Sequence, residues 1–525
     1  MQKKRFFSYK VALIVALGGF LMGFDASVIS GVVGFIETEF ELSKLQLGWA
    51  VSCLTLTATL SMMISGPISD KVGRKKVLSV AALLFLVSAI YSALAPNFVN
   101  LVVARMIGGF GVGAALIIAP MYIAEISPAK IRGRLVSFNQ LNIVLGISVA
   151  FFTNYLILQL GKSDAAWALN LNFAEYNWRW MLGLEALPAI LYFSFLFMVP
   201  ESPRWLIMHG QRDNALGIME KMSGTESAGE EIISIEKSME ADKKKQKVPL
   251  RELFMPAMRL VLTIGIVIAI LQQITGINSV FFYAPMIFEQ TGIGQDASFI
   301  QAIIIGITNL IFTVVAILFV DRLGRKPLLI FGIAGIVLSM FLLGSSFRAA
   351  EYQLSTASVN ELTEIEGYEA LHQIEGKVYE SDIDFKAALI DILGEKKAVE
   401  YQGTIISKAI TINPWLVLIG IIGFVASFAV SLGPVMWILF SELFPNRLRG
   451  LAISFAGFIN SGVSFLVQLL LPWELANIGN AGTFFIYGGF AVLGFFFVLR
   501  FLPETKGKSL EELEALLVRS KRKAK

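Results

Sequence analysis

The chain alternates between long apolar stretches and short polar ones. Because a helix needs about twenty consecutive apolar residues to cross a bilayer, each stretch of that length predicts a membrane span. The pattern predicts twelve spans, at 11–34, 46–68, 77–95, 99–122, 136–160, 180–199, 259–289, 298–320, 328–347, 413–440, 451–474 and 481–501. The predicted fold class is therefore an all-α polytopic membrane protein, and the first apolar stretch is interpreted as a retained span.

Composition excludes most other classes. Of the 525 residues, 55% are hydrophobic and 16% are charged, whereas soluble domains carry about a quarter charged residues. Cys53 is the single cysteine and lies inside an apolar run, which excludes disulfides and thiolate metal sites. The glycine run GGFGVG at 108–113 resembles a nucleotide-binding loop, but it lies inside a span and follows no strand. Its small residues instead favour close helix packing. We expect that the protein is not an enzyme and that it binds no metal, cofactor or nucleic acid.

Lysine and arginine sort to one side of the predicted spans. The positive-inside rule then places both termini and the loop 200–258 in the cytoplasm. We expect a multi-pass protein of the plasma membrane, the inner membrane of a bacterium. The loop 348–412 lies on the opposite side and carries twelve acidic and six basic residues. It either caps the outer vestibule or is a simple elaboration, and the sequence favours the latter.

Three motifs occur twice. SDKVGRKK returns as VDRLGRKP, AEISPAKIRGR returns as SELFPNRLRGL, and PESPRWL returns as PETKGKSL. This repeat predicts two parallel six-helix halves, 1–199 and 259–501, joined by a cytoplasmic linker at 200–258 with short amphipathic helices. Residues 502–525 form a cytoplasmic tail. In such folds the substrate site lies between the halves near the midplane.

One carboxylate stands near the centre of the first span. Asp25 is about fourteen residues into a helix that starts inside, so it lies about 21 Å from the inner edge of the bilayer. Arg105 reaches about the same depth in a span that starts outside, given a core of about 30 Å. Since an unpaired charge at this depth is costly, we predict that the two side chains pair. A purely structural ion pair is one interpretation.

The other interpretation is a proton switch. Burial raises the pKa of an aspartate and a neighbouring arginine lowers it, so a balanced carboxylate can gain a proton from one side and release it to the other. Glu185 is a further acid within a span. It belongs either to a charge network on the cytoplasmic side or to a secondary proton step, and the sequence does not decide between them.

Amides cluster in the seventh span, within QQITGIN. Gln272 and Gln273 precede a predicted break at Gly276, and Asn278 follows it. An amide pair beside a break in an apolar span is costly unless it faces a wet cavity. Amides both donate and accept hydrogen bonds. In the tenth span, Pro434 after Gly433 predicts a bend.

These motifs, together with GPISDKVGRKK and GPVMWILFSELFP, resemble the sugar porter family of the major facilitator superfamily over nearly the whole chain. The resemblance implies a major facilitator fold with twelve helices. Proton-coupled family members have aspartate at the place of Asp25, whereas passive ones usually have a neutral residue. Phe282 and Ser461 differ from residues common in the family, which leaves the identity of the sugar open. By similarity, the sugar-contacting positions are Gln140, Gln272, Gln273, Asn278, Asn309, Trp437 and Asn460.

Charged residues of the repeated loops predict a cytoplasmic gate. They sit where helix ends meet, so they can pair when the inner side is closed and separate when it opens, although a solvated topological anchor is the alternative. The predicted set is Asp70, Arg74, Glu125, Arg132, Asp321, Arg325, Glu442 and Arg449.

The leading hypothesis is a proton–monosaccharide symporter that works by alternating access, driven by the proton gradient and active as a monomer. Its partners are a pentose or hexose, protons and the lipid bilayer. A passive uniporter on the same fold is the runner-up, and the charge at Asp25 argues against it. A non-transporting sugar sensor is disfavoured because only a short tail follows Leu502. A drug antiporter would lack QQITGIN and PESPRW.

Overall fold

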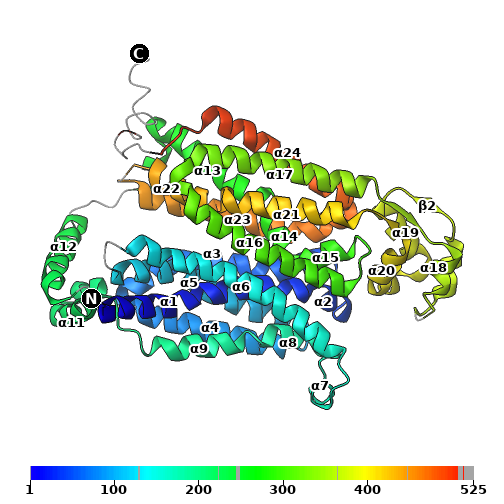
Figure 1. The fold of residues 1–525 in the computed structure, drawn as a ribbon, viewed down its shortest axis with the longest axis horizontal. Helices are drawn as coiled ribbons and strands as arrows, with labels where there is room; N and C mark the ends of the chain where they lie inside the picture. The colour runs from blue at the N-terminus through cyan, green and yellow to red at the C-terminus, as the bar shows by residue number, and fades with distance from the viewer. Residues whose placement is uncertain are drawn as a thin grey trace. The chain divides into compact units, whose positions relative to one another are not determined.

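Apolar helices make up most of the computed structural model, which describes residues 2–127, 131–222, 224–243, 249–363, 365–445, 447–506 and 512 (Figure 1). Within these residues, twelve helical segments are long and apolar enough to cross a membrane. Each overlaps one predicted span, so the predicted span count is confirmed. Their bounds are Phe7–Gly31, Lys44–Val72, Arg74–Ala93, Phe98–Ile126, Arg132–Gly161, Asn177–Leu196, Pro256–Phe282, Gln295–Val320, Arg325–Arg348, Pro414–Leu443, Arg449–Asn477 and Gly479–Phe501.

Eight spans are single helices and four are interrupted. The single helices are α3 (Lys44–Val72), α4 (Arg74–Ala93), α5 (Phe98–Ile126), α6 (Arg132–Gly161), α16 (Gln295–Leu323), α17 (Arg325–Arg348), α23 (Arg449–Asn477) and α24 (Gly479–Phe501). The interrupted spans are built from α1 (Gln2–Val28) with the 3₁₀ turn η1 (Ile29–Gly31), α8 (Asn177–Gly183) with α9 (Ala186–Leu196), α13 (Arg259–Ile274) with α14 (Ile277–Phe282), and α21 (Pro414–Val430) with α22 (Leu432–Leu443).

The break in the seventh span falls where the sequence predicts it. Gly276 has φ +90°, a left-handed conformation that residues with a side chain rarely adopt. A Cβ at this position would lie 2.5 Å from the ring of Tyr487. The span therefore ends as α13 and restarts as α14, followed by α15 (Ala284–Glu289).

The predicted bend in the tenth span needs a correction. The backbone departs from helical geometry at Ser431, with φ −124° and ψ −96°, rather than at Gly433 and Pro434. Pro434 instead lies in the first turn of α22. The first N–H groups of a helix have no partner within it, so a proline is tolerated there and the break comes before it.

Contacts divide the chain into two compact units. The first comprises Met1–Val28, Cys53–Ala150 and Arg179–Pro249. In it α5 packs against α1 and α4, and α4 packs against α9. The glycine run at 108–113 works as a packing face: a Cβ on Gly109 would lie 2.4 Å from the carbonyl oxygen of Leu54, and one on Gly113 would lie 2.2 Å from that of Ala58.

The linker predicted between the two halves contains helices. These are α10 (Pro203–Met208), α11 (Arg212–Met222) and α12 (Thr225–Lys243), followed by the 3₁₀ turns η2 (Leu250–Phe254) and η3 (Pro256–Met258). The helices α10, α11 and α12 contact one another, and Arg212 and Glu236 form an ion pair across α11 and α12 at 3.0 Å. The linker therefore contains short helices that pack on one another.

The second unit comprises Ile29–Ser52, Phe151–Trp178 and Leu250–Lys525. Its main packing pairs are α17 with α24, α17 with α21, and α13 with α23. It also holds α2 (Val33–Glu39), which follows the first span, and α7 (Ala166–Asn170), which lies between the fifth and sixth spans. These contact-based units are defined differently from the repeat, so the two six-helix halves stay a prediction.

The long loop between α17 and α21 is a folded domain, here called the insert domain (residues 351–411). Its helical elements are α18 (Thr356–Asn360), η4 (Tyr368–Gln373), α19 (Asp382–Leu393) and α20 (Glu395–Ala409). Its strands are β1 (Glu351–Gln353), β2 (Val378–Tyr379) and β3 (Ile410–Thr411), in the antiparallel order β2-β1-β3. Its own core includes Leu371, Phe385 and Ile405, and it lies beyond the ends of α17 and α21 (Figure 1).

Candidate functional site

Asp25 and Arg105 form a buried ion pair, as their common depth predicts. Nη1 of Arg105 lies 3.3 Å from Oδ1 of Asp25, and each residue is 1% exposed. Both come from apolar helices of the first unit, α1 and α5, which pack along each other. A buried charge persists at low cost only with such a partner. The pair therefore explains how the first span can carry the charge of Asp25 near its centre.

The second carboxylate oxygen of Asp25 is not used in the same way. Among the described residues Oδ2 has no hydrogen-bond partner, although it is buried. A Cβ on Gly108 would lie 2.8 Å from this oxygen and 2.5 Å from Oγ of Ser88. The missing side chain at Gly108 therefore leaves room beside Oδ2. The arrangement leaves one carboxylate oxygen held by arginine and one able to take a proton.

Glu185 belongs to the same cluster. It is 2% exposed, and it interacts electrostatically with both Asp25 and Arg105. Its Oε1 has no hydrogen-bond partner among the described residues. The sequence left two roles open for this acid, because its neighbours in space come from other helices. The structure therefore shows two carboxylates and one guanidinium close together inside the first unit.

Four of the predicted sugar residues form one hydrogen-bonded group in the second unit. The Asn460 amide donates to Oε1 of Gln272 at 2.8 Å, and the Gln273 amide donates to Oδ1 of Asn460 at 3.2 Å. The Asn278 amide donates to Oε1 of Gln273 at 2.9 Å. The break at Gly276 allows this arrangement, because it places Asn278 beside the amides that precede it.

Two further side chains, Ser464 and Gln468, extend this amide cluster and were not predicted from the sequence. Asn278 donates to Oγ of Ser464 at 2.7 Å, and Gln468 donates to the same oxygen at 2.8 Å. Both residues lie on α23 with Asn460, at successive steps of four residues. That spacing places side chains on one helix face, so a helical projection of the span would have found them.

The other predicted sugar residues are placed differently. Asn309 is buried on α16, at 7% exposure. Trp437 is 48% exposed on α22, where its ring stands edge-on to Phe440 and lies beside Gly457. Gln140 is exposed on α6, in the first unit. The structure thus joins four of the seven residues by hydrogen bonds, and the sugar-contacting role of all seven remains a prediction.

The predicted gate residues of the first unit pair with one another. Arg74 lies 2.9 Å from Asp70 and 3.0 Å from Glu125, and it is buried at the start of α4. Oγ of Ser202 donates to Glu125 at 2.5 Å. The backbone N–H of Arg74 donates to Glu201 at 3.0 Å. Glu201 and Ser202 belong to the PESPRWL motif, so this motif is part of the same charge cluster.

The second unit repeats this arrangement. Arg325 lies 2.8 Å from Glu442, and Oγ1 of Thr505 donates to Glu442 at 2.6 Å. Glu504 accepts backbone hydrogen bonds at the start of α17, as Glu201 does at α4. Partial burial acts to raise the pKa of Glu504, but four backbone N–H groups lower it below its usual value of 4.5. They belong to Lys506, Arg325, Lys326 and Thr505.

Two predicted gate residues, Arg132 and Arg449, have other surroundings. Arg132 is exposed in the first turn of α6, and no ion pair to it occurs within the described part of the chain. Arg449 donates from Nε to the carbonyl oxygen of Phe444 at 3.2 Å. The side chain of Asp321 lies outside the described residues. The gating role of the whole set stays a prediction.

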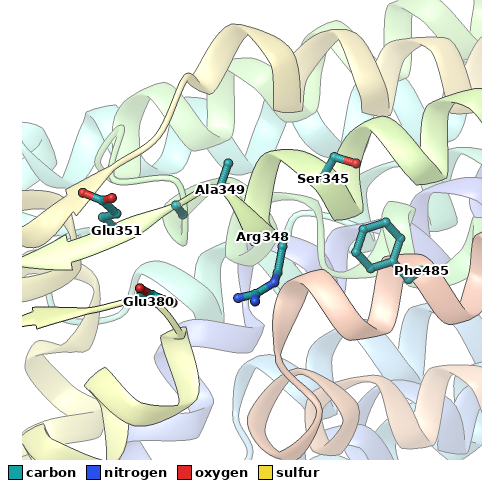
Figure 2. A pocket seen from close by; sticks show the side chains of 7 residues that line it. Ser345, Arg348, Ala349, Glu351, Glu380 and Phe485 are labelled. Atoms are coloured by element: carbon teal, nitrogen blue, oxygen red, sulfur yellow. The ribbon is translucent and has the colours of Figure 1, made fainter.

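Two cavities lie away from the amide cluster, where the insert domain meets the ends of α17 and α24. Their volumes are about 410 and 320 Å³, and both are lined by Arg348, Glu380 and Phe485. Figure 2 shows these three side chains around the larger cavity. No predicted sugar or proton residue lines either cavity. We therefore do not assign them to the transported substrate.

Comparisons with known proteins show the family and the fold of the chain. The chain matches the family described as "Sugar (and other) transporter" over residues 11–363 and 401–517. It is 35% identical over 509 residues to the arabinose-proton symporter of Bacillus subtilis, covering 97% of this chain and 95% of that protein. It is 34% identical over 540 residues to the D-xylose-proton symporter of Escherichia coli, with the same coverages. The inward open structure of the Escherichia coli xylose transporter XylE matches with a TM-score of 0.73 at 33% identity, covering 97% of this chain and 100% of that one.

Proposed function

The chain belongs to the sugar porter family of the major facilitator superfamily, and from this premise we propose that it imports a monosaccharide together with protons. The two relatives described above are proton symporters for arabinose and xylose. Both of those sugars are aldopentoses. An aldose is accordingly the substrate class, and aldopentoses are the first candidates.

The observation that carries the coupling is the buried pair of Asp25 and Arg105. Protonation of the unbonded oxygen of Asp25 neutralises the carboxylate and weakens its ion pair with Arg105. The equilibrium between the outward-open and inward-open states then shifts, because the two protonation states stabilise different packings of the helices. The membrane potential adds about 2.3 kcal/mol per charge per 100 mV to inward proton movement.

Glu185 supports a second proton step. It interacts with both members of the pair, and this favours a role in proton transfer over a separate network on the cytoplasmic side. A second carboxylate gives the proton an acceptor once Asp25 releases it. Without Arg105 to hold them, two buried carboxylates this close would repel each other when both are ionised.

The amide cluster on α13, α14 and α23 is the proposed sugar site. Its amides and the Ser464 hydroxyl donate and accept hydrogen bonds at defined positions, as sugar hydroxyls require. The mutual hydrogen bonds also hold the side chains in place before the sugar binds, which lowers the entropy cost of binding. The exposed indole of Trp437 offers an apolar face for the sugar ring. Gln140 and Asn309 complete the proposed set.

The proposed setting is the plasma membrane of a bacterium, with both termini in the cytoplasm. The lysine and arginine distribution supports this orientation. We propose that the functional unit is a monomer in lipid, that the proton gradient is its energy source, and that it needs no cofactor. The paired arginine clusters at the starts of α4 and α17 serve as its cytoplasmic gate.

The deciding experiment is sugar-induced proton uptake in proteoliposomes. Arabinose, xylose, glucose and galactose are offered to the wild type, to Asp25→Asn and to Glu236→Gln, a control that removes an exposed charge from the linker. We expect the wild type and the control to alkalinise the medium with one sugar. Asp25→Asn should exchange that sugar without moving protons. Proton-free sugar transport that does not change with Asp25→Asn would establish a passive uniporter.

A further inference from the structure

The insert domain is a part of the chain that the transport function does not explain. Residues 364–400 lie within it and outside the part that matches the transporter family. The chain enters the insert domain through β1 and leaves it through β3. These two strands pair antiparallel, with Glu351 opposite Thr411. The chain therefore enters and leaves it at neighbouring points, as expected of a module inserted into an existing loop.

A buried polar network fastens the insert domain to the end of α15 and to the start of α24, the twelfth span. Lys386 donates to Asp382 at 3.0 Å and to Gln290 at 3.3 Å. Asn480, in the first turn of α24, donates to Gln290 at 2.6 Å and to Asp382 at 3.0 Å. Asp382, Gln290 and Asn480 are all less than 10% exposed. Because removing one member would leave buried polar groups unpaired, this junction is a rigid anchor.

The insert domain also reaches the first extracytoplasmic loop. Lys396, at the start of α20, pairs with Glu41 at 2.5 Å, and α20 packs against α2. Lys386 also interacts electrostatically with Glu37 and Lys44, which pair with each other in the same loop. The insert domain thus contacts a segment from the beginning of the chain while anchored to α15 and α24.

The first loop leads directly into a tight contact between α3 and α23, here called the seam. It is formed by Gly48, Trp49, Phe465 and Leu469. A Cβ on Gly48, in α3, would lie 2.0 Å from the carbonyl oxygen of Leu469 in α23. One residue further, Trp49 stands edge-on to Phe465 of α23, with ring centroids 5.8 Å apart. These contacts join the second span to the eleventh at their extracytoplasmic ends. The helices cannot approach more closely at this point, because a Cβ on Gly48 would already overlap the Leu469 carbonyl oxygen.

We propose that the insert domain is a brace that holds the outer side of the transporter closed. This inference rests on the proposed alternating-access function, in which the second and eleventh spans must separate to admit sugar from outside. The domain is fixed to α15 and α24, so separation pulls the first loop away from α20 and breaks the Lys396–Glu41 pair. The brace therefore lowers the population of the outward-open state and sets how readily the transporter returns to it.

The test measures access to the seam directly. Phe465→Cys is placed in a Cys53→Ser background, which removes the only native cysteine, and right-side-out vesicles are labelled with a membrane-impermeant maleimide. Lys396→Glu and Glu41→Lys should each speed labelling by about twofold to fivefold, the range for an exposed ion pair. The double charge exchange should restore the slow rate.

The matched control is Lys397→Glu. Lys397 is the next residue along α20, but it pairs with Glu366 inside the insert domain at 2.8 Å. It changes the same charge without touching the first loop, and labelling should stay slow. Raising the salt concentration should also reduce the difference between the wild type and Lys396→Glu, because exposed charges are screened.

Replacing residues 351–411 by a short linker should speed labelling further than any charge variant. Equal labelling rates across the charge set, with no increase after this excision, would overturn the proposal. If the variant that lacks residues 351–411 does not fold, equal labelling rates in the charge variants are by themselves enough to overturn the proposal. The labelling requires neither sugar nor protons, so a failure of the proposed symport would appear separately, in the proteoliposome assay.

Discussion

The backbone N–H of Arg325 donates a hydrogen bond to the Glu504 carboxylate at 3.1 Å, at the first turn of α17. The repeated motif in the first half does the same: the N–H of Arg74 donates to Glu201 at 3.0 Å at the first turn of α4. A carboxylate there satisfies N–H groups that have no partner within the helix and interacts favourably with the helix dipole. The sequence repeat is thus also a repeat of helix capping.

This cap predicts a pH dependence of stability. The pKa of Glu504 is lowered in the folded protein, so its contribution is fully present above the usual value of 4.5 and is lost as pH falls through the folded value. We expect the wild type to melt at a higher temperature than Glu504→Gln at neutral pH, with the gap closing in acid. Melting curves in detergent between about pH 3 and 7 measure it. Asp391→Asn, an exposed change near the end of α19, should show no such gap. A gap that does not depend on pH would contradict the assignment.

The ion pair in the first unit predicts a specific order of stabilities. Arg105→Met leaves the Asp25 carboxylate buried without its partner, which should cost about 3–5 kcal/mol. The double variant Asp25→Asn with Arg105→Met removes both charges and should recover most of that loss. It should still fail to couple protons to sugar. Thermal unfolding of the purified proteins measures this order. A double variant no more stable than Arg105→Met would show that the unpaired charge of Asp25 is not the main cause of the lost stability.

Gly108 predicts that space beside Asp25 is required. In Gly108→Ala the new Cβ would lie 2.8 Å from Oδ2 of Asp25 and 2.5 Å from Oγ of Ser88, so side chains must shift. Overpacking of this kind costs about 1–3 kcal/mol, and proton-coupled uptake should fall with it. Gly66→Ala is the matched control, because no described atom lies within 4 Å of a Cβ there. Equal stability and uptake in both variants would refute the requirement.

The amide cluster predicts a loss of sugar affinity on removal of one member. Asn460→Leu leaves buried partners on Gln272 and Gln273 unsatisfied and removes a donor from the proposed site. The KM for sugar should rise about 10- to 100-fold. Asn477→Leu, an exposed change near the end of the same helix, should leave the KM unchanged. A fall in melting temperature without a change in KM would instead assign the cluster to helix packing.

The sequence by itself determined the features that depend on one-dimensional chemistry. The number of spans follows from the length of apolar runs, because every backbone group must be satisfied inside the bilayer. The pairing of Asp25 with Arg105 follows from depth, since a helix converts residue count into distance. The break at Gly276 follows from a glycine beside costly polar residues.

Only the tertiary structure decided which distant side chains share a partner. Ser464 joins the amides, and Glu185 joins the ion pair, because helices far apart in sequence pack side by side. The break of the tenth span at Ser431 also depended on context, since a helix start tolerates proline. The insert domain was the largest gap in the prediction. Its strands are two or three residues long and its anchor joins separate segments. No local periodicity in the sequence therefore predicts the domain. The length of an apolar run is a local property of the sequence. Which side chains pair depends on contacts that exist only after folding.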